Sequence, residues 1–231
     1  MKISGSSKLS AGNIDDTIIV SGSARIDGDF SCDAFRSSGS LKSEGNLVVR
    51  GDVKSSGSFR ILGALHGDGN AKFSGSASIG EEIDLKGELE NSGSLRAGGN
   101  IDAIGGMRFS GSSKIDGGLT SEETIEIEGS TTVRGGIKAK NVLIGSQASF
   151  GGKRVSKHPY KVFGDIFATK DIEIINTFVQ GDVRGRNVKI GKRSEILGKV
   201  YYIDTIEIDK KAILTHEPLQ ISEIAENELQ K

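Results

Sequence analysis

Apolar and polar residues alternate in short runs along most of the chain. In segments such as 59–61 (FRI), 83–85 (IDL) and 125–127 (IEI), two apolar residues flank one that is charged. A period of two is typical of β-strands that bury one face. The pattern therefore predicts many short strands before residue 214 and no long helix.

These runs belong to a repeat that is marked by the tripeptide Ser-Gly-Ser. Its central glycine, or the equivalent glycine of Glu-Gly-Ser and Ile-Gly-Ser, recurs at intervals of 16 to 18 residues. A period this constant indicates one structural unit stacked on itself, which is a solenoid. We call these positions the ladder glycines: Gly5, Gly22, Gly39, Gly57, Gly75, Gly93, Gly111, Gly129 and Gly145.

Further glycines divide each repeat into three sides. Gly63 and Gly69, for example, follow Gly57 by six and twelve residues. Glycine tolerates positive φ and close backbone approach, so we expect corners at these positions. The sequence predicts an all-β, three-sided parallel β-helix of about 12 rungs of 17–18 residues, which is a rod of roughly 55–60 Å at about 4.8 Å per rung. The period alone leaves the handedness open.

The alternation also assigns the interior of each rung. In one rung, Ile115, Leu119, Ile125 and Ile127 are expected to point inward, whereas Ser112 has the outward parity. The chain contains no tryptophan, which suits a thin column filled by Ile, Leu and Val.

The chain divides into four parts. Rungs with the Ser-Gly-Ser mark fill residues 1–150, and a second form of the rung fills residues 162–214. Residues 151–161 break the phase and include Pro159, which cannot donate to a central ladder, so we expect a basic loop there. The tail, residues 215–231, has a spacing that permits a short amphipathic helix and is equally compatible with a frayed end. Lys153, Arg154, Lys157 and Lys161 of the loop are candidates for contact with a partner or a membrane.

The charge and the cysteine content limit the binding partners and the cellular compartment that we expect. Thirty basic and 31 acidic residues give a formal net charge of −1, which argues against a general electrostatic grip on nucleic acid or anionic lipid. The single cysteine, Cys32, cannot form an internal disulfide, which favours a reducing compartment. The first rung begins next to Met1 and leaves no room for a signal peptide. We therefore expect a cytoplasmic protein, held at the inner face of the cell membrane only through partners.

The sequence offers no pattern for a nucleotide, a cofactor or a metal ion. No Gly-Lys pair is followed by Ser or Thr in a Walker-type loop, and no glycine cluster joins a strand to a long helix. His66, His158 and His216 lack neighbours at metal-ligand spacing. We expect a protein that is not an enzyme.

The second form of the rung resembles a known family. Residues 162–174 (VFGDIFATKDIEI) and 179–190 (VQGDVRGRNVKI) are similar to the rungs of bactofilins, the polymer-forming bacterial cytoskeletal proteins, and the resemblance is strongest over about 133–208. It implies a right-handed β-helix that stacks end to end into non-polar filaments without nucleotide, often against the inner membrane. Such scaffolds serve cell shape, wall synthesis, motility or flagellar assembly. The implied partners are further copies of the chain, a sister bactofilin, or a protein associated with the membrane or wall. This chain lacks the proline-rich tails and the short apolar N-terminal segment of many members.

Two other classes of protein share the periodicity. A hexapeptide-repeat acyltransferase, with a left-handed β-helix, also has three sides of six residues, and its catalytic histidine would have to be His158. A secreted adhesin or ice-binding β-solenoid would use the serine rows beside the ladder glycines as a flat polar face. Binding of acetyl-coenzyme A would distinguish the acyltransferase from a filament-forming protein.

The ends of the rod are the predicted working surfaces. A parallel β-helix ends in a rung whose backbone groups lack partners and whose core lacks a cover. We expect no N-terminal segment to cover the first rung, and only the tail to serve as a lid for the last. The candidate polymerisation residues are Ile3, Leu9, Ile14 and Ile18 at one end, and Tyr201, Ile203, Ile206, Ile208, Ile213 and Leu214 at the other.

Overall fold

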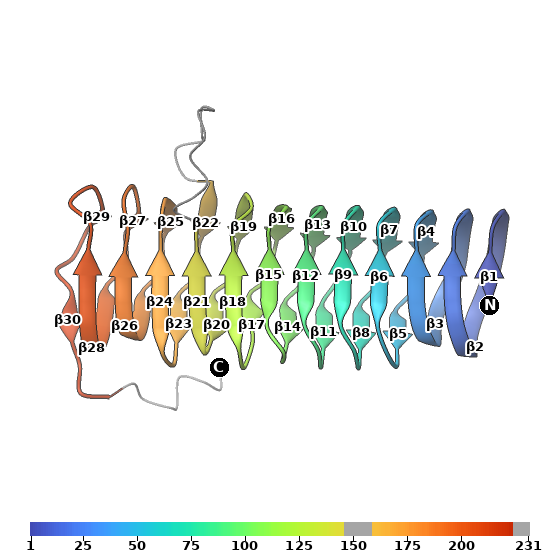
Figure 1. Ribbon diagram of the computed structural model, residues 1–231, viewed down its shortest axis with the longest axis horizontal. Helices are drawn as coiled ribbons and strands as arrows, with labels where there is room; N and C mark the ends of the chain where they lie inside the picture. Colours follow the sequence, from blue (N-terminus) through green and yellow to red (C-terminus); the bar gives the residue numbers. More distant parts are fainter. Residues whose placement is uncertain (146–158, 224–231) are drawn as a thin grey trace.

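The computed structural model describes residues 1–145 and 159–223, which form a rod (Figure 1). These residues contain 30 strands of a single sheet that coils into a parallel β-solenoid of about 11 turns, and they contain no helix. The predicted all-β parallel β-helix is confirmed, and the number of turns is close to the predicted number of rungs.

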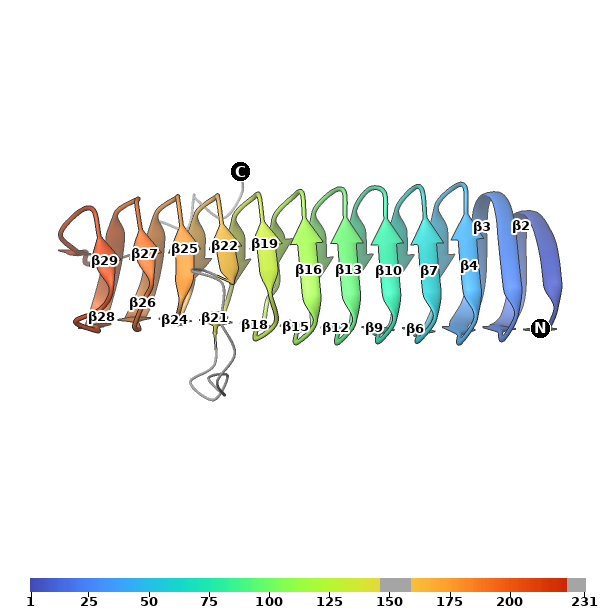
Figure 2. The ribbon, with the colours of Figure 1, turned by 90° about the horizontal axis from the view of Figure 1, so that it is seen from above.

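Three parallel ladders run along the rod, one on each face. Each rung adds a strand to each face, and equivalent residues of successive rungs pair in register, as Ser76–Ile79 do with Ser94–Ala97. We number the faces in the order in which the chain visits them after a ladder glycine. Face 3 is in front in Figure 1, and face 1 is in front in Figure 2.

Each face consists of short strands from successive rungs. Face 1 contains β4 (Ser40–Ser43), β7 (Ser58–Ile61), β10 (Ser76–Ile79), β13 (Ser94–Ala97), β16 (Ser112–Ile115), β19 (Thr131–Val133), β22 (Tyr160–Val162), β25 (Thr177–Val179), β27 (Glu195–Ile196) and β29 (Ile213–Leu214). Face 2 contains β5 (Leu47–Val49), β8 (Leu65–Gly67), β11 (Ile83–Leu85), β14 (Ile101–Ala103), β17 (Leu119–Thr120), β20 (Ile137–Ala139), β23 (Ile166–Ala168) and β30 (Leu219–Gln220). Face 3 contains β1 (Lys2–Ile3), β6 (Val53–Ser55), β9 (Ala71–Phe73), β12 (Leu89–Asn91), β15 (Met107–Phe109), β18 (Thr124–Ile127), β21 (Asn141–Ile144) and β24 (Asp171–Ile174).

Four longer strands bend across corners. β2 (Ser6–Val20) and β3 (Ser23–Ser37) contribute to all three faces, and β26 (Val183–Ile190) and β28 (Val200–Ile208) contribute to faces 2 and 3.

The interior is the predicted apolar column. Ile115, Leu119, Ile125 and Ile127 are each at most 1% exposed, whereas Ser112 is exposed. The inward parity of this rung is therefore confirmed.

The ladder glycines are required by close stacking of the backbone. A Cβ added to Gly93 would overlap the carbonyl oxygen of Gly75 in the preceding rung, and the same relation links the ladder glycines from Gly22 to Gly129. Among the described glycines, positive φ occurs only at Gly12, Gly28, Gly106 and Gly145. Close approach to the preceding rung therefore accounts for the ladder glycines from Gly22 to Gly129, whereas Gly145 has positive φ and Gly5 has open space around it.

Asn and Asp side chains fasten the corners between rungs. The Ala64 N–H donates to Asn46 Oδ1 at 2.8 Å, the Gly118 N–H to Asn100 Oδ1 at 2.9 Å, and the Asp182 N–H to Asp165 Oδ1 at 2.8 Å. A Cβ on Gly63 would overlap the Asn46 Oδ1 atom. The corner glycine thus leaves room for the acceptor that satisfies a backbone N–H of the next rung.

The ladders continue on both sides of residues 146–158. Thr131 of β19 pairs with Tyr160 of β22, and Val142 of β21 pairs with Ile172 of β24. Lys161 was expected in the basic loop, but it is an exposed residue of β22 because the repeat resumes at Tyr160.

The described part of the tail contains a strand, and most of the segment whose spacing permits a helix, residues 224–231, lies outside the described residues. Leu219 and Gln220 form β30, which pairs with Tyr201 and Tyr202 of β28. The strand forms because β28 presents a free edge on face 2.

Candidate end interfaces

The first turn leaves part of the apolar column open. Leu9 and Ile14 are half-buried residues of β2 that pack against the core. Residues 6–14 of β2 pair with β3 on one side and with no described strand on the other. Ile3 is only 4% exposed, and Ile18 is fully buried one turn further in, beneath β1. Of the four residues predicted for this end, Leu9 and Ile14 are the accessible ones.

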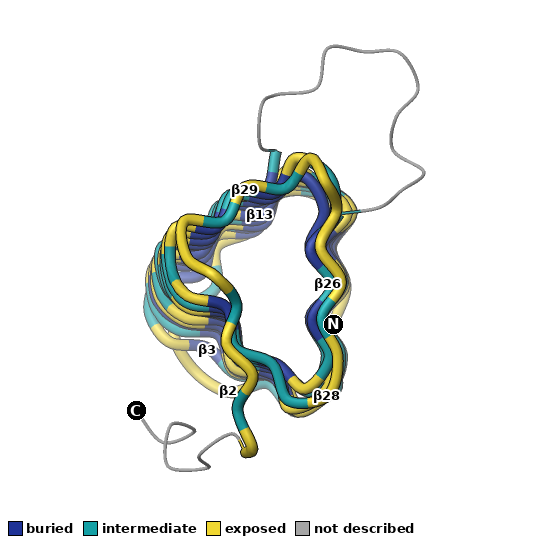
Figure 3. Tube along the Cα trace, turned by 90° about the vertical axis from the view of Figure 1, so that its left-hand side faces the viewer, coloured by how far each residue is buried: buried dark blue, intermediate teal, exposed yellow. Residues whose placement is uncertain are grey.

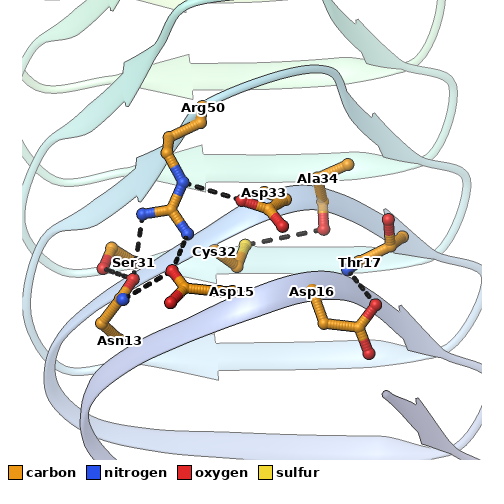
Figure 4. A network of polar contacts seen from close by, with 9 residues as sticks. All are labelled: Asn13, Asp15, Asp16, Thr17, Ser31, Cys32, Asp33, Ala34 and Arg50. Carbon is orange, nitrogen blue, oxygen red and sulfur yellow. Dashed lines mark hydrogen bonds and ion pairs between the residues drawn. The ribbon is translucent and has the colours of Figure 1, made fainter.

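A polar network joins the first three turns on the outside (Figure 4). Arg50 forms ion pairs with Asp15 at 2.6 Å and with Asp33 at 2.8 Å, and its Nη1 donates to Asn13 Oδ1 at 3.0 Å. The hydrogen bond to Asp33 is the main reason that the pKa of Arg50 is raised. One guanidinium therefore connects residues of three successive rungs at the N-terminal end.

Cys32 lies beside this network but faces the interior. Its side chain is fully buried, and its Sγ is 3.6 Å from the carbonyl oxygen of Ala34 (Figure 4). Burial raises the pKa of the Cys32 thiol to about 11. The neutral thiol is a core residue in this structure.

The last turn presents a larger apolar surface. Figure 3 shows this end face-on, with the buried residues lining the inside of the ring. Tyr202, Ile206 and Leu214 are half-buried residues that pack against the core, and Ile208 is 43% exposed. Ile206 and Ile208 lie on face 3 and Leu214 lies on face 1, where no described strand follows them, whereas on face 2 the strand β30 pairs beyond Tyr202.

Some of the residues predicted for this end lie on the outer wall. Tyr201 lies under the guanidinium of Arg184, whose Cζ is 5.0 Å from the ring centroid. Ile213 is 61% exposed and pairs in register with the outward residue Glu195. Ile203, half-buried, accepts a hydrogen bond at its carbonyl from Gln220 Nε2. Tyr202 is not among the predicted residues, although its pairing partner Gly185 occupies the equivalent inward position one rung earlier.

A shallow hollow lies beside the last turn. Its volume is about 300 Å³, and its lining comprises Ile175, Lys189, Ile190, Gly191, Lys192, Glu207, Ile208 and Asp209. Ile208 thus belongs both to the end surface and to this hollow, which has room for a side chain of a neighbouring molecule.

The other candidate groups do not form a site among the described residues. Lys153, Arg154, Lys157 and His158 lie outside them. His66 is on the outer wall, with its Nδ1 atom 3.9 Å from Asp84 Oδ2, and His216 is exposed. In the part of the chain that the structure describes, no group of three or more His, Cys, Asp or Glu residues could hold a metal ion, and no helix could cross a membrane. Within the described residues, the apolar column itself is open to solvent at the two ends of the rod.

Comparison with known proteins assigns no family. No protein-family model matches the chain, and neither the curated proteins nor the solved structures include a match to it.

Proposed function

We propose that the protein is a structural scaffold whose rods stack end to end into filaments. The observation that carries the proposal is the open apolar surface of the last turn, formed by Ile206, Ile208 and Leu214. Burying these side chains would contribute roughly 25 cal/mol for each Å² removed from water. A second rod has a surface of the same size and shape to cover them.

Unpaired strand edges support the same proposal. The outer edges of β29 and β30 have no described partner, and neither have residues 6–14 of β2. A second rod placed on either end would satisfy these N–H and C=O groups and would continue the sheet. Each contact would then combine backbone hydrogen bonds with burial of the core.

The resemblance of residues 133–208 to bactofilins supplies the finer features of the proposal. Like ends meet, so the filament is non-polar, and assembly needs no nucleotide because burial and pairing alone drive it. The resemblance also implies right-handed winding, a cytoplasmic location and a role in cell shape, wall synthesis, motility or flagellar assembly.

The test is negative-stain microscopy and sedimentation of the purified protein and its variants. Ile208→Arg places a charge on the end surface at a residue already 43% exposed, so we expect a folded protein that no longer pellets. Val48→Arg is the matched control, because Val48 is 42% exposed on the outer wall, and it should still form filaments. Leu9→Arg tests the other end and avoids Ile3, whose burial would confuse assembly with stability.

A wild-type protein that stays monomeric over a wide range of concentration and salt would refute end stacking. Loss of assembly in the Val48→Arg control would show that any added charge is enough, and would also count against it. Binding of acetyl-coenzyme A would favour the acyltransferase instead.

A further inference from the structure

Face 1 carries a column of like charges. Arg60, Ser78, Arg96 and Lys114 are outward residues of β7, β10, β13 and β16, and they pair in register on successive rungs. The remaining outward residues of these four strands are serines. Arg60, Arg96 and Lys114 form no ion pair with any residue that the structure describes. We call these three the basic patch.

Acidic residues gather on the opposite side of the neighbouring corner. Glu81 and Glu82 follow Gly80 at the end of β10 and lead into β11, where Asp84 pairs in register with Asp102 of β14. Within the described residues, Glu81, Glu82 and Asp102 have no ion-pair partner. We call these three the acidic patch.

Face 3 shows how the same rod neutralises its charges elsewhere. There the outward residues Lys72, Glu90, Arg108 and Glu126 alternate in sign along the register. Lys72 Nζ lies 2.7 Å from Glu90 Oε2, and Arg108 Nη2 lies 2.7 Å from Glu126 Oε2. In this fold, opposite charges on successive rungs can therefore neutralise each other. Among the residues that the structure describes, those of the two patches have no such oppositely charged neighbours.

The like-charge columns cost stability in an isolated rod. Strands in a sheet are about 4.8 Å apart, so Arg96 repels Lys114, and Asp84 repels Asp102. A partner that presents opposite charges at the same spacing would remove the repulsion at both patches. Arg96 and Asp102 lie on one rung, Lys114 lies on the next, and Glu81 and Glu82 lie on the one before. In an antiparallel second copy related by a two-fold axis at the rung of Arg96, Asp102 would face Arg96, and Glu81 and Glu82 would face Lys114, whereas Arg60 would have no acidic counterpart.

We propose that two rods pair side by side along the corner between faces 1 and 2, with the basic patch of each on the acidic patch of the other. Both patches adjoin this corner, so one two-fold axis across it satisfies both at once in an antiparallel pair. Gly80 and Gly98 stack at this corner, and a Cβ on Gly98 would overlap the Gly80 carbonyl oxygen. Gly80 and Gly98 therefore place no side chain between the rods, and the corner side chains on the rung of Gly80 are Glu81 and Glu82 of the acidic patch.

Side-by-side pairing is separate from end stacking. It doubles the width of a filament if rods stack, and it converts monomers into dimers if they do not. Because exposed charges carry it, it weakens as salt rises, whereas end stacking through apolar residues does not.

A charge-swap experiment tests the proposal. One variant carries Arg60→Glu, Arg96→Glu and Lys114→Glu, and the other carries Glu81→Lys, Glu82→Lys and Asp102→Lys. Each variant by itself should remain as unpaired rods at low salt. Its affinity for side-by-side pairing should fall roughly a hundredfold, because the two-fold axis doubles every lost contact. An equal mixture of the two should pair again, since each supplies the charges that the other now needs.

The matched control is Arg36→Glu, Lys54→Glu and Arg108→Glu, which makes the same change of net charge on face 3 and should leave pairing intact. Circular dichroism verifies the fold of each variant. The proposal is overturned if wild-type protein shows only single rods at low salt, if either reversed variant still pairs, or if the mixture fails to pair. Sedimentation velocity and filament width measure these outcomes whether or not rods stack end to end.

Discussion

The type of residue that fits at a given position of this rod is determined by the groups one rung away. The ladder glycines from Gly22 to Gly129 result from a contact 17 or 18 residues distant, since a Cβ at each would overlap the carbonyl oxygen of the preceding ladder glycine. The positions of these glycines could be predicted from the sequence, because their period is visible. Their cause could not, because close approach and positive φ both select glycine.

We therefore expect Gly93→Ala to destabilise the rod by about 3 kcal/mol, because the new Cβ must push adjacent rungs apart. Ser94→Ala, at the next residue, changes an exposed side chain and should shift the stability by less than about 0.5 kcal/mol. Urea unfolding of both variants measures the difference. Equal midpoints would show that the backbone spacing adjusts without cost.

The alternation of apolar and polar residues determines which side chains of a strand face inward, and a neighbouring strand with a free edge determines where a further strand can form. Parity is visible in the sequence, which is why the inward assignment of Ile125 and Ile127 is confirmed. The free edge is a property of the assembled rod, and it explains why β30 was not predicted. The burial of Ile3, against the half-burial of Leu9, was equally hidden, because it depends on how the first strands lie over the second turn.

Ile125→Asp should cost about 4 kcal/mol or prevent folding, because the carboxylate would be fully buried among apolar residues. Ser112→Ala, on the outer wall of a nearby strand, should be close to neutral. Melting temperatures followed by circular dichroism compare the two. A similar melting temperature for both variants would contradict the parity of this rung.

At the scale of the whole molecule, the rod is a stack of nearly interchangeable turns. Face 1 pairs β7 with β10 and β10 with β13 through the same four positions. Stability in such a stack is close to a sum of contributions from each turn and from each contact between neighbours. Removal of one complete turn should therefore leave a shorter rod with the same architecture.

Deletion of residues 76–93 joins Gly75 to Ser94 and restores Ser-Gly-Ser at the junction. We expect a folded rod about 4.8 Å shorter, measured by small-angle X-ray scattering. Deletion of residues 76–84 removes an odd number of residues and reverses the parity of the strands after the junction, so it should disrupt the stack. A half-turn deletion tolerated as well as the full turn would refute the independence of the turns.

The pairing of strands across residues 146–158 also affects the folding kinetics of the rod. Ser58 and Ser76, which pair on face 1, are 18 residues apart, whereas Thr131 and Tyr160 are 29 apart. The additional entropy of closing the longer loop is about 0.4 kcal/mol. Nucleation on either side of this point can therefore propagate across it at nearly the same rate as elsewhere, and the chain has no kinetic boundary where its two forms of the repeat meet.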